Sequence, residues 1–486
     1  MLAILKVVSH LMHKDSEAVP MPSERIRSFF PHDPTGDQEL FFVAMNSFLV
    51  HAPEEKMAFV LKGFAGTGKT TAIAALVKAL PGLGWRAMML APTGRAAKIM
   101  SAYAHKTGFT IHKIIYRSRT VGGKAAGFEL QKNYYQKTVF IVDEASMLAD
   151  EQAGGRSLLR DLMDYVYQNA GNRLLLIGDT AQLPPVGSVN SPALDKNYLV
   201  RYLRLLVEEC MLTEVTRQHL ASGILYNATK LRDEVVKEKP QIGFKTKGFS
   251  DFYRMTGERL EDGLRYAYDK FGLDNTVVIT RSNKTAVQYN QYIRRMIFFY
   301  EDEVTAGDRL MIVKNNYTYM EDTGKVSFLA NGDFVEILKI RSFEELYGLR
   351  FAKVELRLVD YPEELPFEAR IILDTLHSPY PALEESQWRD LYVKVEEEYR
   401  QMDGETGVRE SLKKDPYLNA LQVKFAYSLT CHKSQGGQWE AVFVDQGYLK
   451  EDQLDKEYIR WLYTAMTRAK QELFMVNFHP RFFIKD

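Results

Sequence analysis

Eight consecutive residues constrain the fold of this chain more than any other feature. Residues 63–70 (GFAGTGKT) match the pattern G-x-x-x-x-G-K-[S/T]; they follow the apolar run 57–63 (MAFVLKG) and precede a helical pattern at 70–80. A strand, a glycine-rich turn and a helix in this order direct backbone N–H groups to one point, at the positive end of the helix dipole. The segment therefore predicts an α/β domain that binds a phosphate group.

Two sets of alternating strand and helix patterns extend along the chain. In the first set, apolar runs at 86–92, 140–143 and 173–179 alternate with helical patterns at 94–105 and 156–170. In the second set, apolar runs at 275–280, 440–445 and 472–478 accompany helical patterns at 284–300 and 457–470. Alternating units of this kind form parallel sheets that are covered by helices on both faces. The chain is therefore predicted to be an α/β protein with two cores in tandem.

Two further segments interrupt these cores. Residues 106–137 contain seven basic residues and one acidic residue, which gives this segment a net charge of +6. Residues 305–420 contain four extended runs separated by turn residues, at 309–313, 334–340, 353–359 and 367–373. That pattern is typical of a small β-barrel. The last part of the insertion, 381–420, has ten acidic and six basic residues in a helical pattern.

Net charge, cysteine content and the N-terminal apolar run exclude several classes of protein. The 486 residues include 63 basic and 63 acidic side chains, so attraction to nucleic acid or to a membrane must come from a local patch. Two cysteines, Cys210 and Cys431, are too few for a disulfide framework or a cysteine-based zinc site, and they favour a reducing compartment. The apolar run 2–12 contains Lys6 and His10 and is too short to span a bilayer. It is interpreted as a surface helix and not as a signal peptide.

A pair of acidic residues, Asp143 and Glu144, follows the apolar run 140–142. Ligands of α/β sheets bind at the carboxyl ends of the strands, so both carboxylates are expected beside the phosphate-binding loop. Lys69 would reach the β- and γ-phosphates and contact only phosphate and solvent, while Thr70 and Asp143 would hold Mg²⁺. Glu144 would orient and deprotonate the attacking water. ATP and Mg²⁺ are therefore the predicted cofactors.

Seven short motifs occur in a fixed order along nearly the whole chain. They are residues 63–70, 91–98 (APTGRAAK), 142–147 (VDEASM), 176–187 (LIGDTAQLPPVG), 212–218 (LTEVTRQ), 430–438 (TCHKSQGGQ) and 462–470 (LYTAMTRAK). This order resembles superfamily-one DNA helicases of the RecD/Dda-like, 5′-to-3′ branch. The resemblance implies an α/β fold of two tandem RecA-like P-loop cores, with a small hairpin insertion in the first and an SH3-like β-barrel insertion in the second. It also implies that ATP binds between the cores and that single-stranded DNA lies across them.

The resemblance assigns further residues to the nucleotide. Gln38 matches the glutamine that reads adenine, and Gln182 matches the residue that senses the γ-phosphate. Arg217 and Arg468 match two arginines that reach the γ-phosphate from the second core and stabilise charge in the transition state. The loop residues expected to hold the nucleotide are Gly66, Thr67, Gly68, Lys69, Thr70 and Thr71. Gln438 stands where the family often has a glutamate that contacts the ribose, so the preference for ATP over dATP stays open.

Short polar residues match the family's contacts to the nucleic-acid backbone: Thr93, Thr110, His112, His432 and Ser434. Hydroxyl and imidazole groups suit phosphate contacts, which carry no sequence information. In the basic segment 106–137, aromatic rings interleave with cations, as expected for stacking on single-stranded bases. In the family this insertion is a hairpin that splits the duplex. Residues 122–124 and 127–129 are predicted to form its turn and tip, with Phe128 as the separating ring.

These interpretations divide the chain into domains. The first core (1A) is assigned to residues 1–216, with the hairpin (1B) at 106–137 inserted in it. The second core (2A) is assigned to 217–304 and 421–486. The SH3-like insertion with its acidic helical extension (2B) is assigned to 305–420.

The predicted function is an ATP-dependent 5′-to-3′ DNA helicase or translocase on single-stranded DNA, with forked or tailed duplex DNA as substrate. Two alternatives stay open: a nucleic-acid-dependent ATPase that remodels protein–DNA complexes without processive unwinding, and an RNA-directed superfamily-one enzyme. The chain is expected to be a cytoplasmic monomer, nucleoid-associated if bacterial, with no membrane contact. A replication or repair protein is a candidate partner. The direction of movement rests on the resemblance alone.

Overall fold

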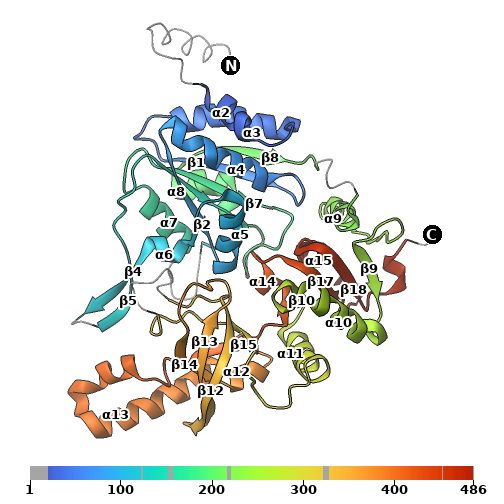
Figure 1. Cartoon of the computed structure of the whole chain (residues 1–486). Coiled ribbons are helices and arrows are strands. Elements are labelled where there is room, and N and C mark those ends of the chain that lie inside the picture. Colours follow the sequence, from blue (N-terminus) through green and yellow to red (C-terminus); the bar gives the residue numbers. More distant parts are fainter. Residues whose placement is uncertain are drawn as a thin grey trace.

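The computed structural model describes residues 20–121, 124–150, 157–215, 221–320, 328–450 and 453–484. At 118–121, 124–128, 403–406 and 409 it describes the backbone but not the side chains. Figure 1 shows two α/β cores and a β-barrel that lies below the first core and beside the second. The surface helix predicted at 2–12 lies outside the described residues.

The first core is built on a six-stranded parallel sheet in the order β3-β2-β6-β7-β1-β8. Its strands are β1 (Met57–Gly63), β2 (Arg86–Ala91), β3 (Gly108–Thr110), β6 (Thr138–Val142), β7 (Arg173–Gly178) and β8 (Leu206–Leu212). All the strands run in one direction, so their carboxyl ends meet at one edge of the sheet, where ligands of such sheets bind.

Helices cover both faces of this sheet. Phe59 and Leu61 of β1 pack on one face with α2 (Pro22–Phe29), α3 (Gly36–Val50), α4 (Lys69–Ala79) and α5 (Gly94–Ala104). Ala58 and Val60 pack on the other face with α6 (Ile111–Ile115), α7 (Leu158–Val166) and α8 (Lys196–Leu203). Successive side chains of a strand point to opposite faces, so a strand buried on both sides needs an unbroken apolar run.

The second core is a five-stranded parallel sheet in the order β16-β10-β17-β18-β9. Its strands are β9 (Phe252–Met255), β10 (Thr276–Thr280), β16 (Ser428–Thr430), β17 (Trp439–Asp445) and β18 (Ala469–Val476). Helices α9 (Gly223–Glu234), α14 (Cys431–Ser434) and α15 (Lys456–Met466) cover one face. The other face is covered by α10 (Leu260–Phe271) and by α11 (Asn283–Tyr292) with its π-helical end (Ile293–Ile297). The prediction of two tandem α/β cores is therefore confirmed, although β9 and β16 were not predicted.

The insertion in the second core is a closed five-stranded barrel. Its strands are β11 (Arg309–Ile312), β12 (Phe334–Leu346), β13 (Leu349–Leu358), β14 (Phe367–Ile372) and β15 (Leu421–Phe425). The four extended runs predicted from sequence are its first four strands, which confirms the barrel. The fifth strand, β15, lies beyond the predicted boundary at residue 420. Only Ala426 and Tyr427 separate it from β16, so the two strands look like one apolar run in the sequence.

The acidic extension of the barrel is helical, as predicted. After the short helix α12 (Asp374–His377), the 30-residue helix α13 (Glu385–Lys414) projects beside the barrel (Figure 1). Leu391 and Val395 of α13 pack against Phe351 and Ile372 of the barrel. None of the helices in the described part of the chain is long and apolar enough to cross a membrane.

The basic insertion of the first core contains a two-stranded antiparallel hairpin. Its strands are β4 (Tyr116–Val121) and β5 (Lys124–Leu130), which extend away from the first core (Figure 1). Of the turn predicted at 122–124, residues 122–123 lie outside the described residues, and Lys124 is the first residue of β5. Residues 127–129 were predicted as the tip, but they lie within β5, where Phe128 is opposite Ser118. That prediction is wrong, because Gly127 is accommodated inside a strand and forms no turn.

Candidate active site between the two cores

The glycine-rich segment 63–70 connects β1 to α4. Gly66 and Gly68 have φ angles of +78° and +76°, the left-handed conformation that favours glycine. A Cβ atom at Gly63 would lie 3.0 Å from side-chain atoms of Thr67 and Lys69, so glycine allows the loop to close tightly. Helix α4 begins at Lys69, so the N–H groups of its first turn are directed at the loop. This geometry is what an anion site at a helix N-terminus requires.

The ammonium group of Lys69 lies inside this loop. Its Nζ donates hydrogen bonds to the backbone oxygens of Gly63 at 2.7 Å and of Phe64 at 2.8 Å. The expectation that Lys69 contacts only phosphate and solvent is therefore wrong, because the loop wraps around the side chain and brings its carbonyls within reach. The positive charge is nevertheless held where the β- and γ-phosphates are expected.

Asp143 and Glu144 follow β6 at the carboxyl edge of the first sheet. The Tyr103 hydroxyl donates to Asp143 Oδ2 at 2.8 Å, and the Glu144 N–H donates to Asp143 Oδ1 at 2.9 Å. Burial and the neighbouring Glu144 raise the pKa of Asp143, and burial and Asp143 raise the pKa of Tyr103 well above its ordinary value. Glu144 has a φ of 53°, a conformation that costs energy outside glycine and clusters at functional sites.

Thr70 and Asp143, the residues predicted to hold Mg²⁺, line one cavity. Thr70 is exposed at the first turn of α4, whereas Asp143 is half-buried across the cavity. Hydroxyl and carboxylate oxygens are the donors that Mg²⁺ prefers, and this ion commonly binds through one or two carboxylates together with phosphate and water oxygens. The described part of the chain contains no cluster of three or more His, Cys, Asp or Glu side chains suited to a metal. The residues thus fit a metal ion that a nucleotide brings with it.

Arg468 extends into the same cavity from the second core. It lies in the turn between α15 and β18, and its side chain is 2% exposed. Its Nη1 lies 3.5 Å from Glu144 Oε1 of the first core and donates to the Gly437 oxygen at 3.3 Å. Its Nε donates to the Thr464 oxygen at 3.1 Å. A buried arginine fixed by backbone carbonyls therefore faces the carboxylate that was predicted to activate water.

Further contacts between the cores surround this pair, and the sequence analysis did not find them. The Tyr463 hydroxyl donates to Asp179 Oδ2 at 2.7 Å and accepts the N–H of Ala65 at 2.9 Å. The N–H of Leu183 donates to Thr464 Oγ1 at 2.8 Å. Tyr463 and Thr464 precede Arg468 by one helical turn, so α15 holds the first core at the position from which Arg468 reaches the cavity. The only sequence feature that could have indicated these contacts is the position of Tyr463 and Thr464 within the motif 462–470.

The cavity between the cores has a volume of about 840 Å³. Ten residues predicted to act on the nucleotide line it: Gly66, Gly68, Lys69, Thr70, Thr71, Asp143, Glu144, Gln182, Gln438 and Arg468. Ligand pockets have volumes of roughly 300–1,000 Å³, so the space is sufficient for a nucleoside triphosphate. Arg217 lies outside the described residues.

Gln38 is placed differently from the residues that line this cavity. Its side chain is 1% exposed, its Oε1 accepts the N–H of Thr35 at 2.9 Å, and its Nε2 donates to the Thr67 oxygen at 3.0 Å. Gln38 therefore caps α3 and holds the phosphate-binding loop in this structure. Thr67, which is 1% exposed, is likewise part of the loop's own packing, since its Oγ1 donates to the Phe64 oxygen.

Three of the residues predicted to contact nucleic acid direct their hydroxyl groups to the protein backbone. Thr93 Oγ1 accepts the N–H of Ala96 and caps α5, and Thr110 Oγ1 accepts the N–H of Lys113 and caps α6. Ser434 is fully buried, and its hydroxyl donates to the Cys431 oxygen at 2.8 Å. Such helix caps are the commonest structural role of these residue types.

His112, one of the two predicted histidines, lies at a junction between the first core and the barrel insertion. The His112 ring contacts Phe328 of the barrel insertion, with ring centroids 5.9 Å apart. Burial lowers the pKa of His112 to about 4 and also lowers the pKa of His432, so both imidazoles are neutral at pH 7. Thr93 lies beside the barrel turn at Gly332, where a Cβ atom would be 3.9 Å from Thr93 Cγ2. The Phe128 side chain lies outside the described residues.

Arg95 is a junction residue that the sequence analysis missed. Its guanidinium carbon lies 4.1 Å from the ring centre of Trp439 in the second core and 5.0 Å from that of Phe334 in the barrel. Its Nη2 also donates to the Gln438 oxygen at 3.4 Å. Since Arg95 belongs to α5 of the first core, one side chain contacts all three structural units.

Comparison with known proteins agrees with this architecture. A model of the AAA domain family matches residues 48–240, and a model of the UvrD-like helicase C-terminal domain matches residues 425–476. The ATP-dependent RecD2 DNA helicase of Deinococcus radiodurans is 24% identical over 426 residues, which cover 85% of this chain and 46% of that protein. The Dda helicase of Enterobacteria phage T4 is 27% identical over 313 residues, which cover 61% of this chain and 66% of that protein.

Two further similarities cover most of both chains. Uncharacterized protein R530 of Acanthamoeba polyphaga mimivirus is 24% identical over 489 residues, covering 86% of this chain and 95% of that protein. The solved structure of a Bacteroides Pif1 helicase in complex with ADP-AlF3 and single-stranded DNA is 15% identical, with a TM-score of 0.48 over 94% of this chain and 95% of that one.

The two family-model matches and the similarity to RecD2 and Dda together support a superfamily-one helicase of the RecD/Dda branch, a class of enzymes that hydrolyse ATP. It spans about half the length of RecD2 and about two thirds of the length of Dda.

Proposed function

We propose that this chain moves 5′ to 3′ along single-stranded DNA and separates the strands of a forked or tailed duplex. Hydrolysis of Mg²⁺-bound ATP between the two cores would drive this movement. The observation that carries hydrolysis between the cores is the contact of Glu144 of the first core with Arg468 of the second, 3.5 Å apart in the lining of a cavity of about 840 Å³. Each core supplies one part of the chemistry, so hydrolysis depends on how the cores are placed. The direction of movement is proposed from the resemblance to the helicase family.

The residues of the cleft have distinct roles in this proposal. Lys69 and the N–H groups at the start of α4 bind the β- and γ-phosphates. Thr70 and Asp143 would hold a metal ion, which would supply positive charge beside the phosphate oxygens. Glu144 accepts a proton from the attacking water, and Gln182 senses the γ-phosphate. Arg217, Gln38 and Gln438 are proposed to contact the γ-phosphate, the adenine and the ribose.

Arg468 couples this chemistry to movement of the cores. An arginine reaching from the opposite side of a cleft stabilises transition-state charge only when the two sides are close. When the γ-phosphate has left, the attraction across the cleft weakens and the cores can separate. The contacts of Tyr463 and Thr464 on α15 would transmit that change to Asp179 and Leu183 of the first core. A cycle of closing and opening then moves the cores along a bound strand.

The nucleic-acid track is proposed to cross both cores beneath the barrel. Thr93, Thr110 and His112 belong to the first core, and His432 and Ser434 to the second. Contact of Phe328 with His112 and of the Gly332 turn with Thr93 supports a channel whose wall includes the barrel. The helix caps at Thr93 and Thr110 leave N–H groups of short helices near the track. Phosphate contacts through such groups would be independent of sequence.

Strand separation is proposed to occur at the basic hairpin. Arg117 pairs with Glu129 across the hairpin, with 2.6 Å between Nη2 and a carboxylate oxygen, so the base of the hairpin is held by charge as well as by strand pairing. Phe128 stays the residue proposed to stack at the fork. The hairpin leaves the first core on the side where the barrel lies (Figure 1).

Partial duplexes test the proposal directly. A duplex with a 5′ single-stranded tail should be unwound in the presence of ATP and Mg²⁺, whereas a duplex with a 3′ tail should stay intact. Unwinding of the 3′-tailed duplex alone would refute the polarity. ATPase activity without unwinding of either duplex would support an enzyme that remodels protein–DNA complexes, and stronger stimulation by RNA than by DNA would support an RNA-directed enzyme.

A further inference from the structure

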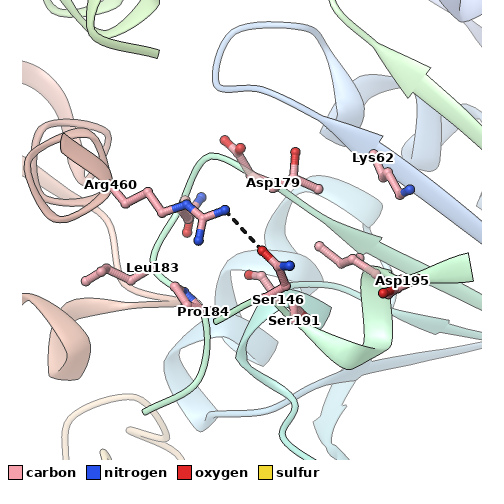
Figure 2. Close-up of a pocket in the computed structure, with 12 residues that line it drawn as sticks. Lys62, Ser146, Asp179, Leu183, Pro184, Ser191, Asp195 and Arg460 are labelled. Carbon is pink, nitrogen blue, oxygen red and sulfur yellow. Dashed lines mark hydrogen bonds between the residues drawn. The ribbon is translucent and has the colours of Figure 1, made fainter. Parts of the chain in front are cut away.

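A second polar cavity lies next to the nucleotide cleft. It has a volume of about 200 Å³, and Asp179 and Gln182 line both spaces. Figure 2 shows Arg460 entering it from the second core, toward the first-core residues Ser146 and Ser191. We call this space the Arg460 cavity. Asp179 and Gln182 follow β7, so the loop after that strand separates the Arg460 cavity from the nucleotide cleft.

Several buried polar atoms at this cavity have no hydrogen-bond partner in the described protein. They are Ser146 Oγ, Gln182 Oε1 and Arg460 Nε. Ser146 is 2% exposed and Gln182 is 8% exposed, so bulk water does not readily satisfy them. Buried polar groups in proteins are nearly always paired, and an unpaired set that surrounds one cavity indicates a polar ligand. The Ser146 hydroxyl and the Arg460 Nε–H can donate hydrogen bonds to an oxyanion, and Gln182 Oε1 can accept one from a protonated oxygen of the same anion.

The charges of the cavity favour weak binding of an anion. Arg460 is fixed by its Nη1, which donates to the Val189 oxygen at 2.8 Å, and by its Nη2, which lies 3.3 Å from Asn190 Oδ1. The carboxylate of Asp179 is engaged by the Tyr463 hydroxyl at 2.7 Å and by the N–H of Ala181 at 2.9 Å. The opposing carboxylate is therefore hydrogen-bonded on both oxygens. The Nε–H group of Arg460, in contrast, has no acceptor in the described protein.

Two more charged residues line the cavity, and their opposite charges nearly cancel. Lys62 contributes an ammonium whose Nζ pairs with Glu209 at 2.7 Å, and Asp195 contributes a carboxylate that accepts the N–H groups of Asn197 and Tyr198. With two cations and two carboxylates in its lining, the cavity would hold an anion briefly and then release it. Weak binding of this kind suits a site through which an anion passes on its way out of the protein.

We propose that the Arg460 cavity is a transient site for the inorganic phosphate that leaves the nucleotide cleft after hydrolysis. The inference rests on the proposed hydrolysis of ATP in that cleft. There, a bond forms between the water oxygen and the γ-phosphorus, and the bond to the β–γ bridging oxygen breaks with its electron pair retained by ADP. The water proton passes to Glu144 and then to solvent. The products are ADP, which stays on the phosphate-binding loop, and inorganic phosphate, which passes Gln182 into the second cavity.

This route ties the loss of phosphate to the movement of the cores. Arg460 lies on α15, one turn before Tyr463 and Thr464 and two turns before the turn that carries Arg468. The helix that carries the arginine proposed to receive the product therefore leads directly into the turn with the arginine that acts in hydrolysis. Separation of the cores withdraws Arg460 from the first-core wall of the cavity and opens it to solvent.

Two variants test the proposal in the full-length protein. Arg460→Gln removes the cation but keeps a long polar side chain, and Asn190→Trp places a bulky ring at the exposed rim of the cavity. Hydrolysis in a single turnover on single-stranded DNA is followed by rapid quench, and release of inorganic phosphate is followed with a fluorescent phosphate-binding protein. Controls are Lys456→Gln, an exposed cation on the same helix, and Val189→Trp, a neighbouring side chain that is 83% exposed.

Both variants should hydrolyse ATP at the rate of the unmodified protein but release phosphate about tenfold more slowly. In Arg460→Gln the reason is loss of a charged hydrogen bond, and in Asn190→Trp it is obstruction of the rim by the ring. Arg460→Lys should restore most of the release rate, and the two controls should behave like the unmodified protein. Release that keeps pace with hydrolysis in both variants would overturn the proposal. Equal slowing of hydrolysis and release would also overturn it, because Arg460 would then act on the chemical step. Absence of hydrolysis in the unmodified protein would refute the proposed function itself.

Discussion

The nucleotide cleft and the nucleic-acid track differ in how their residues are held. In the cleft, ten predicted residues line one cavity. There the Asp143 carboxylate accepts the Glu144 N–H, and the Glu144 carboxylate lies 3.5 Å from Arg468 Nη1. Along the track, Thr93, Thr110 and Ser434 hydrogen-bond to nearby backbone groups.

The difference follows from what each site has to do. Charge at a phosphoryl-transfer centre must be fixed before the reaction, because preorganised groups stabilise the transition state without reorganising. Contacts to a strand that moves through the protein must form and break at each step, so weak backbone and hydroxyl contacts are sufficient. We therefore expect single substitutions in the cleft to have large effects and single substitutions along the track to have modest ones.

Replacement of Lys69 by alanine should have the largest effect. The variant should lose measurable DNA-stimulated ATPase activity, because the ammonium group binds the phosphates. Its two hydrogen bonds to Gly63 and Phe64 contribute about 1 kcal/mol each, so the fold should survive. ATPase assays and thermal unfolding measure the two effects. Lys78→Ala, at the exposed end of the same helix, is the matched control, and retained activity in Lys69→Ala would remove the phosphate-binding assignment.

Replacement of Glu144 by glutamine should keep nucleotide binding and slow turnover by roughly a hundredfold or more, as expected for loss of a general base. The amide cannot accept the proton from water, but it can still accept a hydrogen bond from Arg468. Equilibrium binding of a fluorescent ATP analogue and single-turnover hydrolysis separate the two properties. Loss of binding would instead make Glu144 a structural residue or a direct ligand of the metal ion.

Replacement of Phe128 by alanine should affect strand separation alone. Unwinding of the 5′-tailed duplex should fall several-fold, since stacking on a base contributes about 1–3 kcal/mol, while DNA-stimulated ATPase activity stays nearly unchanged. Tyr134→Ala is the control, because this ring lies in the same basic segment and is 78% exposed. Equal loss of ATPase activity and unwinding in the Phe128 variant would place the ring in the structural core.

The smallest predicted effect is a dependence of DNA binding on pH. Lys433 follows His432 in the motif 430–438, and we propose that it also contacts the nucleic-acid backbone. Burial lowers the pKa of Lys433 to about 8, so its side chain is charged at pH 7 and largely neutral at pH 9. Attraction to phosphate is present below pH 8 and is lost above it, so affinity for single-stranded DNA should fall a few-fold between pH 7 and pH 9. Fluorescence anisotropy of labelled single-stranded DNA at fixed salt concentration measures this affinity at each pH. Lys433→Gln should flatten the profile and the exposed Lys239→Gln should not; identical profiles would remove Lys433 from the track.

The sequence was sufficient for features that are local in the chain. The glycine-rich loop, the carboxylates after β6 and four barrel strands each lie within a short window, where residue type and spacing determine conformation. The pairing of Glu144 with Arg468 spans 324 positions, and only the resemblance to a family predicted it. Tyr103, Arg95 and Tyr463 were missed because an aromatic or basic residue on a helix has no local signature of a contact with a distant part of the chain.

Ambiguity of residue type explains the other differences. Gly127 indicates a turn in sequence but fits inside β5, and β15 was assigned to the second core because its apolar run leads directly into β16. Serine and threonine cap helices as readily as they bind phosphate, so Ser434 and Thr110 could not be placed by chemistry alone.

The central claim is that hydrolysis requires both cores, and replacement of Arg468 by alanine tests it most directly. Steady-state ATPase activity on saturating single-stranded DNA should show kcat reduced by about a hundredfold or more with KM within about threefold, because the arginine acts mainly in the transition state. Arg468→Lys, which keeps the charge but not the planar geometry, should recover only part of kcat. A change in KM alone, or full activity in Arg468→Ala, would contradict a site assembled from the two cores.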